Sequence, residues 1–151
     1  MYRTVISDTS CFIILSNIGE LDLLFKVFGK VITTGVIAEE FGECLPEWVE
    51  VIPVKDGYRQ MLLEMQIDKG ESSAIALALE IPDCILVLDD FKARKIASKL
   101  NLLYTGTLGV IIKAKRIGVI PSIKPFLEKI RKTNFRIAPD LELQALKEAG
   151  E

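Results

Sequence analysis

The hydrophobic positions of the chain follow two alternating periods. Short, nearly continuous apolar runs typical of strands occupy Tyr2–Ser7, Val31–Thr33, Trp48–Val54, Ile85–Leu88 and Leu102–Tyr104. Segments with the helical spacing of apolar residues are Thr9–Ser16, Glu20–Phe28, Val36–Phe41, Tyr58–Ile67, Glu71–Glu80, Phe91–Leu100, Leu108–Lys115, Ile123–Arg131 and Pro139–Ala149. This alternation predicts an α/β fold with a mainly parallel central sheet wrapped by helices. The uniformly apolar run Ile85–Leu88 favours a strand that is buried on both faces.

Two of the helical segments have apolar residues that predict how they pack. Glu20–Phe28 is expected to bury one face, made of Leu21, Leu24, Phe25 and Phe28. Pro139–Ala149 is expected to dock through Leu141, Leu143 and Leu146. With 151 residues, no internal repeat and no long linker, the chain is expected to form one domain, residues 1–151.

Acidic and hydroxyl side chains follow the predicted strands at the points where the strands end. Asp8 follows the first strand, and Asp89 and Asp90 follow Ile85–Leu88. Thr105 and Thr107 follow the strand Leu102–Tyr104. Because ligands of parallel α/β sheets bind beyond the carboxyl ends of the strands, we expect these residues to share a site.

Two glutamates extend this set of acids. Glu71 begins a helix directly after Gly70, and Glu40 lies on the helix that follows Gly35. Carboxylates that converge without matching cations repel one another unless they are protonated or bridged by a cation. Mg²⁺ and Mn²⁺ prefer oxygen ligands, so the sequence predicts a divalent metal site that lacks His and Cys.

Each acid also has a purely structural interpretation. Asp8 and Asp90 could cap the helices that follow them, and Glu71 could favour the positive end of its helix. Glu40 could be a solvated helix residue. The segment Thr105–Thr107 could form a turn and an N-cap or could hold a phosphate, and the sequence does not decide between these roles.

The composition excludes several kinds of chemistry. The chain has no histidine, which removes Ser-His-Asp and Cys-His catalysis and most zinc enzymes. Cys11, Cys44 and Cys84 form no CxxC pair, and their positions predict buried, reduced thiols in a cytosolic protein. The longest apolar region, Ala74–Leu88, contains Glu80, Pro82 and Asp83, so we expect no membrane span and a cytoplasmic location.

Charge is distributed unevenly along the chain. From Lys92 to Arg136 there are twelve Lys or Arg residues and one acid, Glu128. From Met1 to Asp90 there are six Lys or Arg residues against sixteen acids. This asymmetry favours a polyanionic partner that meets an acidic site, although a solvated surface with segregated charges would give the same counts.

Six segments in a fixed order carry a resemblance to a known family. They are Val5–Ser10, Val36–Phe41, Gly70–Ala78, Val87–Arg94, Thr105–Gly109 and Ala114–Gly118. Together they span most of the chain. In them the chain resembles PIN-domain proteins, the nuclease family that includes VapC-type toxins. It is most similar to a subgroup of PIN-like proteins of unassigned function.

The resemblance implies a Rossmann-like α/β/α domain and an acidic pocket that binds one or two Mg²⁺ or Mn²⁺ ions. Asp8 matches the first family acid, Glu40 the second, Glu71 the third, and Asp89 or Asp90 the fourth. Typical toxins have Thr-x-Asp where this chain has Leu88-Asp89-Asp90, which leaves open which aspartate binds metal. Many members have Asp at the position of Glu71.

The activity implied by the resemblance is that of a ribonuclease (an endonuclease) that hydrolyses RNA phosphodiesters. Asp8, Glu71 and Asp89 or Asp90 would hold a metal ion that activates water and binds the scissile phosphate, and Glu40 would orient these groups. Residues expected to contact RNA phosphates are Lys92, Arg94, Lys95, Lys99, Thr105 and Thr107. The resemblance also implies a homodimer and, for toxin-like members, a small antitoxin partner.

Two other functions compete with this one. Asp8 and the Asp89-Asp90 pair also suggest a phosphatase of the haloacid dehalogenase type. Ser10, however, stands where that mechanism needs a second aspartate. The other alternative is a non-catalytic PIN-like module that binds RNA or protein. The complete set of acids favours the enzyme over this module.

Overall fold

The apolar run before Asp89 forms an interior strand of the sheet. In the computed structural model, which describes residues 3–151, this run is β4 (Cys84–Val87). It pairs in parallel with β1 (Thr4–Ser7) and β5 (Leu103–Thr105). β1 pairs with β2 (Val31–Thr33) and β2 with β3 (Val49–Val51), which gives the order β3-β2-β1-β4-β5. All five described strands are parallel, which confirms the predicted α/β fold.

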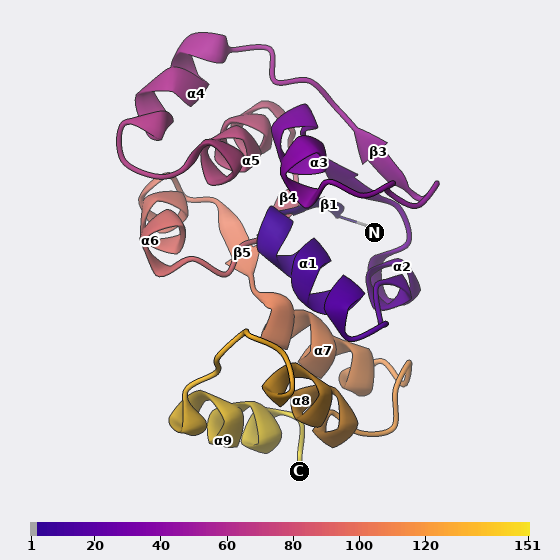
Figure 1. Cartoon of the computed structure of the whole chain (residues 1–151). Helices are drawn as coiled ribbons and strands as arrows, with labels where there is room; N and C mark the ends of the chain where they lie inside the picture. The colour runs from indigo at the N-terminus through magenta and orange to yellow at the C-terminus, as the bar shows by residue number, and fades with distance from the viewer. Residues whose placement is uncertain (1–2) are drawn as a thin grey trace.

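Helices flank this sheet in the part of the chain that the structure describes (Figure 1). They are α1 (Thr9–Asn17), α2 (Asp22–Phe28), α3 (Gly35–Phe41), α4 (Gly57–Glu64), α5 (Lys69–Glu80), α6 (Phe91–Lys99), α7 (Thr107–Arg116), α8 (Lys124–Arg131) and α9 (Pro139–Glu148). α5 packs against β1 and β4, and both α3 and α4 pack against α5. At the other end of the molecule, α7 packs against α2 and α9. None of the described helices is long and apolar enough to cross a membrane.

The two central strands are buried on both faces. Val5 and Ile6 of β1 are at most 2% exposed, and Leu86 and Val87 of β4 are fully buried. Because successive side chains of a strand point to opposite faces, the core lies on both sides of the sheet. A ligand can therefore approach these strands only at their ends, and in parallel sheets ligands bind beyond the carboxyl ends.

Side-chain caps fix the starts of several helices. The capping residues are Asp8 for α1, Thr34 for α3, Asp56 for α4, Asp68 for α5 and Asp90 for α6. Each accepts a hydrogen bond from a backbone N–H that the helix leaves without a partner, which typically stabilises a helix by about 1 kcal/mol. The structural interpretation of Asp8 and Asp90 as caps is confirmed.

The predicted packing of α2 is partly wrong. Leu24 is buried as expected, but Phe25 is 48% exposed and stacks on Trp48, with 5.7 Å between the ring centroids. Leu23 takes the buried position instead, at 2% exposed. Leu21 and Phe28 pack partly buried against the core, so Phe25 is the predicted residue that the structure leaves outside.

The predicted docking of α9 is also partly wrong. Leu141 is 50% exposed and Leu143 is 68% exposed. The buried residues are Ala145 and Ala149, and Leu146 packs partly buried against the core. Alanines at the contact allow the helix backbone to lie close to its neighbours, so the large side chains remain outside.

Three smaller predictions also differ from the structure. The extended segment predicted for Trp48–Val54 contains only the short strand β3. Of the three cysteines, Cys11 and Cys84 are buried as expected, but Cys44 is exposed. The first predicted strand began at Tyr2, which lies outside the described residues.

The buried centre of β4 gives a direct test of this packing. Leu86→Ala removes a fully buried side chain and should lower the free energy of unfolding by about 2–5 kcal/mol, as cavity-forming substitutions do. Leu143→Ala, on the exposed face of α9, is the matched control and should change it by about 0.5 kcal/mol or less. Urea denaturation of both variants measures the difference, and equal effects would show that β4 is not central to the core.

Candidate active site

Asp8 places a buried carboxylate at the end of β1. The residue is 3% exposed. Its Oδ1 accepts a hydrogen bond from the Cys11 amide at 2.9 Å, and its Oδ2 accepts one from the Asp89 amide at 3.1 Å. These two bonds connect the end of β1 to the end of β4.

Burial makes this carboxylate hard to ionise. Desolvation is the main cause that raises the pKa of Asp8 from 3.8 to about 7, and the charge of Asp89 raises it further. The hydrogen bonds from the two backbone amides and the positive charge of Arg94 act in the opposite direction. In the metal-free protein Asp8 therefore keeps its proton up to about pH 7.

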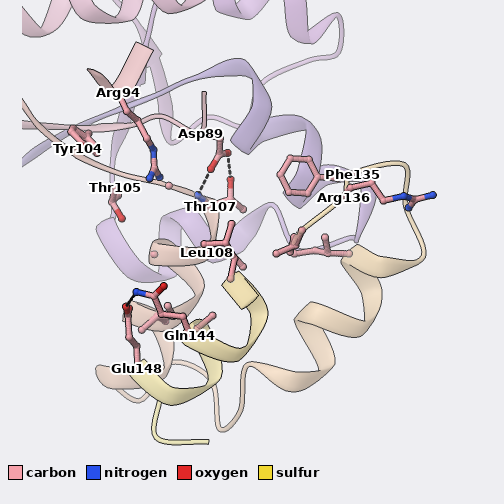
Figure 2. A pocket seen from close by; sticks show the side chains of 17 residues that line it. Asp89, Arg94, Tyr104, Thr105, Thr107, Leu108, Phe135, Arg136, Gln144 and Glu148 are labelled. Atoms are coloured by element: carbon pink, nitrogen blue, oxygen red, sulfur yellow. Dashed lines mark hydrogen bonds between the residues drawn. The ribbon is translucent and has the colours of Figure 1, made fainter. Parts of the chain in front are cut away.

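Asp89 is held by the first residue of α7. Its Oδ1 accepts a hydrogen bond from the Thr107 amide at 2.8 Å, and its Oδ2 accepts one from the Thr107 hydroxyl (Figure 2). Because Thr107 follows β5, this contact joins the carboxyl ends of β4 and β5. The carboxylate of Asp89 is thus fixed beside that of Asp8 and is only half-buried.

A cation lies near these acids, contrary to the expectation that they have none. The guanidinium of Arg94 donates from Nε to the Leu88 carbonyl and packs over the Tyr104 ring at 5.3 Å from its centroid. Both Arg94 and Asp89 lie directly against Gly106, where a Cβ would fall on Arg94 Nη2 and 2.7 Å from Asp89 Oδ1. Glycine at this position leaves space for both side chains.

Glu40 reaches the same region from α3. Its Oε1 accepts a hydrogen bond from the Thr9 hydroxyl at 3.1 Å, and Thr9 is the residue after Asp8. The carboxylate also lies against Gly70 of α5, where a Cβ would collide with Oε1. Gly70 precedes Glu71, so Glu40 lies between the neighbours of two other predicted acids.

Glu71 is the third acid, and its environment also opposes ionisation. Partial burial is the main cause that raises the pKa of Glu71 from 4.5 to about 8. A hydrogen bond that the protonated Glu71 side chain donates to Asp68, and the charges of Asp68 and Asp90, raise it further. Asp90 itself caps α6 and accepts a hydrogen bond from the Ala93 amide at 2.9 Å.

The two adjacent aspartates therefore have different neighbours. Asp89 acts on the pKa of Asp8, whereas Asp90 acts on that of Glu71. The acids therefore form two groups, Asp8 with Asp89 and Glu71 with Asp68 and Asp90. Glu40 contacts Thr9 and Gly70, which are the chain neighbours of Asp8 and Glu71. No ion pair with Lys or Arg engages any of these acids within residues 3–151.

The donor chemistry of this set suits a hard divalent cation. All donors are oxygens, and burial and mutual repulsion hold two of the carboxyl groups partly protonated, which a bound cation would reverse. The described residues contain no group of three or more His, Cys, Asp or Glu side chains gathered closely enough around one point to hold an ion. The residue types therefore suit a divalent metal ion, but their side chains do not form a complete coordination shell.

The predicted RNA contacts fall into two groups. Lys92, Lys95 and Lys99 are exposed on α6. Arg94 is turned inward, and Thr107 is bound to Asp89, so these two belong to the acidic site itself. Thr105 is half-buried at the end of β5.

Three residues of the site were not predicted. Asp68 caps α5 and lies beside Glu71, and Thr9 holds Glu40. Gly106 provides the space for Arg94 and Asp89. The sequence contained a signal only for Asp68, because Asp three residues before Glu is the spacing of a capping box.

The chain was compared with known proteins in three ways. Residues 4–151 match a family model described as PIN domain. Neither the comparison with curated proteins nor the comparison with solved structures gave a match. The family match covers nearly the whole chain.

The raised pKa values predict how stability depends on pH in metal-free solution. Because the folded state retains protons on Asp8 and Glu71 that the unfolded chain has released, the free energy of unfolding should fall as pH rises from about 4 to about 8. In Asp8→Asn, the part of this decline that lies between about pH 4 and 7 should become smaller by a few kcal/mol or less. Urea denaturation across this pH range in EDTA measures the slope.

Asp140→Asn is the matched control for that experiment. Asp140 is exposed in the first turn of α9, so its substitution should leave the slope unchanged. If Asp8→Asn and wild type lose stability with pH at the same rate, the carboxyl group of Asp8 does not have the raised pKa described here.

Proposed function

Because the chain belongs to the PIN-domain family, we propose that it is a metal-dependent ribonuclease that hydrolyses RNA phosphodiester bonds. The observation that carries this proposal is the linked arrangement of acids at the carboxyl ends of β1 and β4. Asp8 is bound to the backbone of Asp89, and Glu40 is bound to the residue that follows Asp8. A scaffold would not need several unpaired carboxylates at one edge of its sheet.

The residues that would hold Mg²⁺ or Mn²⁺ are Asp8 and Asp89 on one side and Glu71 and Asp90 on the other. When bound, such an ion supplies an activated water and stabilises the negative charge of the phosphate. The oxygen-only donor set supports this choice of metal. Because Asp89 and Asp90 face different partners, the proposal assigns both to the site and does not select one.

The protein's own groups orient this chemistry. Backbone amides fix both oxygens of Asp8, and Thr107 fixes both oxygens of Asp89, so neither carboxylate must reorganise when RNA arrives. Glu40, which accepts a hydrogen bond from Thr9, would orient a metal-bound water or the other acids. Arg94 would bind a phosphate of the substrate, and the exposed lysines of α6 would attract the neighbouring phosphates of the RNA.

The remaining parts of the functional hypothesis rest on the family alone. A role as the toxin of a toxin–antitoxin pair, with a small antitoxin protein as partner, is a proposal of this kind. A homodimer is another. Neither the toxin role nor the homodimer changes the metal site and the reaction proposed above.

Removal of the buried carboxylate should abolish cleavage. In a mixture of structured RNAs with Mg²⁺ or Mn²⁺, Asp8→Asn should cut at least about 100-fold more slowly than wild type. Removing a residue that only supports a metal ligand costs up to about 100-fold, and removing a ligand itself should cost more. Gel analysis with mapped RNA ends measures the rate and separates specific cuts from degradation.

Two controls belong to this assay. Asp140→Asn, which removes an exposed acid on α9, should retain the wild-type rate, and EDTA should stop cleavage by both proteins. Full metal-dependent cleavage by a clean preparation of Asp8→Asn would end the proposal. An acyl-phosphate trapped on Asp8 would instead support a phosphatase.

A further inference from the structure

A cavity of about 420 Å³ opens directly beside the acidic site. It lies between the end of β5 and the helices α7, α8 and α9, with Asp89 and Arg94 at one end (Figure 2). Its volume falls in the range of roughly 300–1,000 Å³ that is usual for small-molecule sites. A group bound in this cavity would therefore lie next to Asp89 and Arg94.

The lining of the cavity is suited to a flat aromatic ligand. Leu108, Ile112 and Ile137 contribute apolar surface, and Leu141, half exposed, extends it along α9. The rings of Tyr104 and Phe135, which are 38% and 36% exposed, lie at its margin. Unstacked bases of single-stranded RNA bind to surfaces of this kind, where aromatic and apolar side chains replace the neighbouring bases.

The far end of the cavity carries two polar side chains, Gln144 and Glu148, which are exposed to solvent. Gln144 donates from Nε2 to Oε1 of Glu148 at 3.1 Å, both on α9 (Figure 2). This bond leaves the amide oxygen of Gln144 and the second carboxylate oxygen of Glu148 as acceptors. Two acceptors together favour a ligand that presents N–H groups.

Arg94 supplies the charge that connects this cavity to RNA. Its guanidinium is held on one side by the Leu88 carbonyl and the Tyr104 ring, and it lines the cavity beside Asp89. Guanidinium groups bind phosphate oxygens with two parallel hydrogen bonds. A phosphate at Arg94 would place the attached nucleotide at the mouth of the cavity.

We propose that this cavity is a nucleobase pocket that receives one unstacked base of single-stranded RNA next to the cleaved phosphate. The inference rests on the proposed ribonuclease function, since it takes the occupant to be part of the RNA substrate. The acceptors at its far end select a base with an exocyclic amino group. Cytosine is preferred to uracil, because uracil presents carbonyl oxygens on both sides of its single N–H.

Binding of short RNAs without cleavage tests the pocket. Fluorescein-labelled oligocytidine and oligouridine are titrated with the full chain in EDTA, and fluorescence anisotropy gives the affinity. Oligocytidine should bind about tenfold more tightly than oligouridine. Glu148→Gln, which replaces an acceptor by an amide, should reduce that preference to about twofold.

Leu141 and Leu143 form a matched pair for the apolar surface. Both are exposed on α9, but only Leu141 lines the cavity. Leu141→Ala should weaken oligocytidine binding about fivefold, and Leu143→Ala should leave it unchanged. Thermal unfolding of each variant confirms that the fold is retained.

Any of three results would overturn the proposed nucleobase pocket. They are equal affinity for the two RNAs, no measurable binding, and equal effects of the two leucine substitutions. These results are independent of cleavage. If RNA is cleaved in Mg²⁺ but the anisotropy experiment shows no base preference, the proposed function stands and the pocket does not. If the base preference and the Leu141 effect appear but no cleavage occurs, the pocket stands as an RNA-binding site and the ribonuclease proposal fails.

Discussion

The structure depends on how it buries the carboxylate of Asp8 at the end of a central parallel strand. Charged groups in such a position are costly unless they are neutralised or bound by several donors. Here two backbone amides bind the carboxylate, and its pKa is raised to about 7. The sheet supplies these donors because β1 and β4 are adjacent and end at the same edge.

The surrounding residues follow from this constraint. Asp89 is fixed beside Asp8 by Thr107, and Arg94 offsets part of the negative charge without forming an ion pair with either acid. Gly106 and Gly70 lack the Cβ that would otherwise displace the side chains packed against them. Asp8 and Asp90 serve both as helix caps and as members of the candidate catalytic set. Their structural roles and their proposed chemistry are thus compatible.

Much of the fold could be predicted because it depends on local patterns. The apolar run of β4 and the acids that follow it were sufficient to place Asp8 and Asp89 at one edge of a parallel sheet. The inward turn of Arg94 could not be predicted, because its side-chain conformation depends on the Leu88 carbonyl at the end of β4 and on the Tyr104 ring of β5. The exposed Leu143 shows the same limit, since a helical pattern does not reveal which face its neighbours cover.

The central claim is that the two groups of acids act as one set that binds a divalent ion. Calorimetric titration of the metal-free protein with Mn²⁺ tests it most directly, with Asp8→Asn and Glu71→Gln compared with wild type and Asp140→Asn. The account predicts that substitution in either group weakens the same binding event by tenfold or more, while Asp140→Asn leaves it unchanged. Binding of Mn²⁺ that is unaffected by both Asp8→Asn and Glu71→Gln would contradict it.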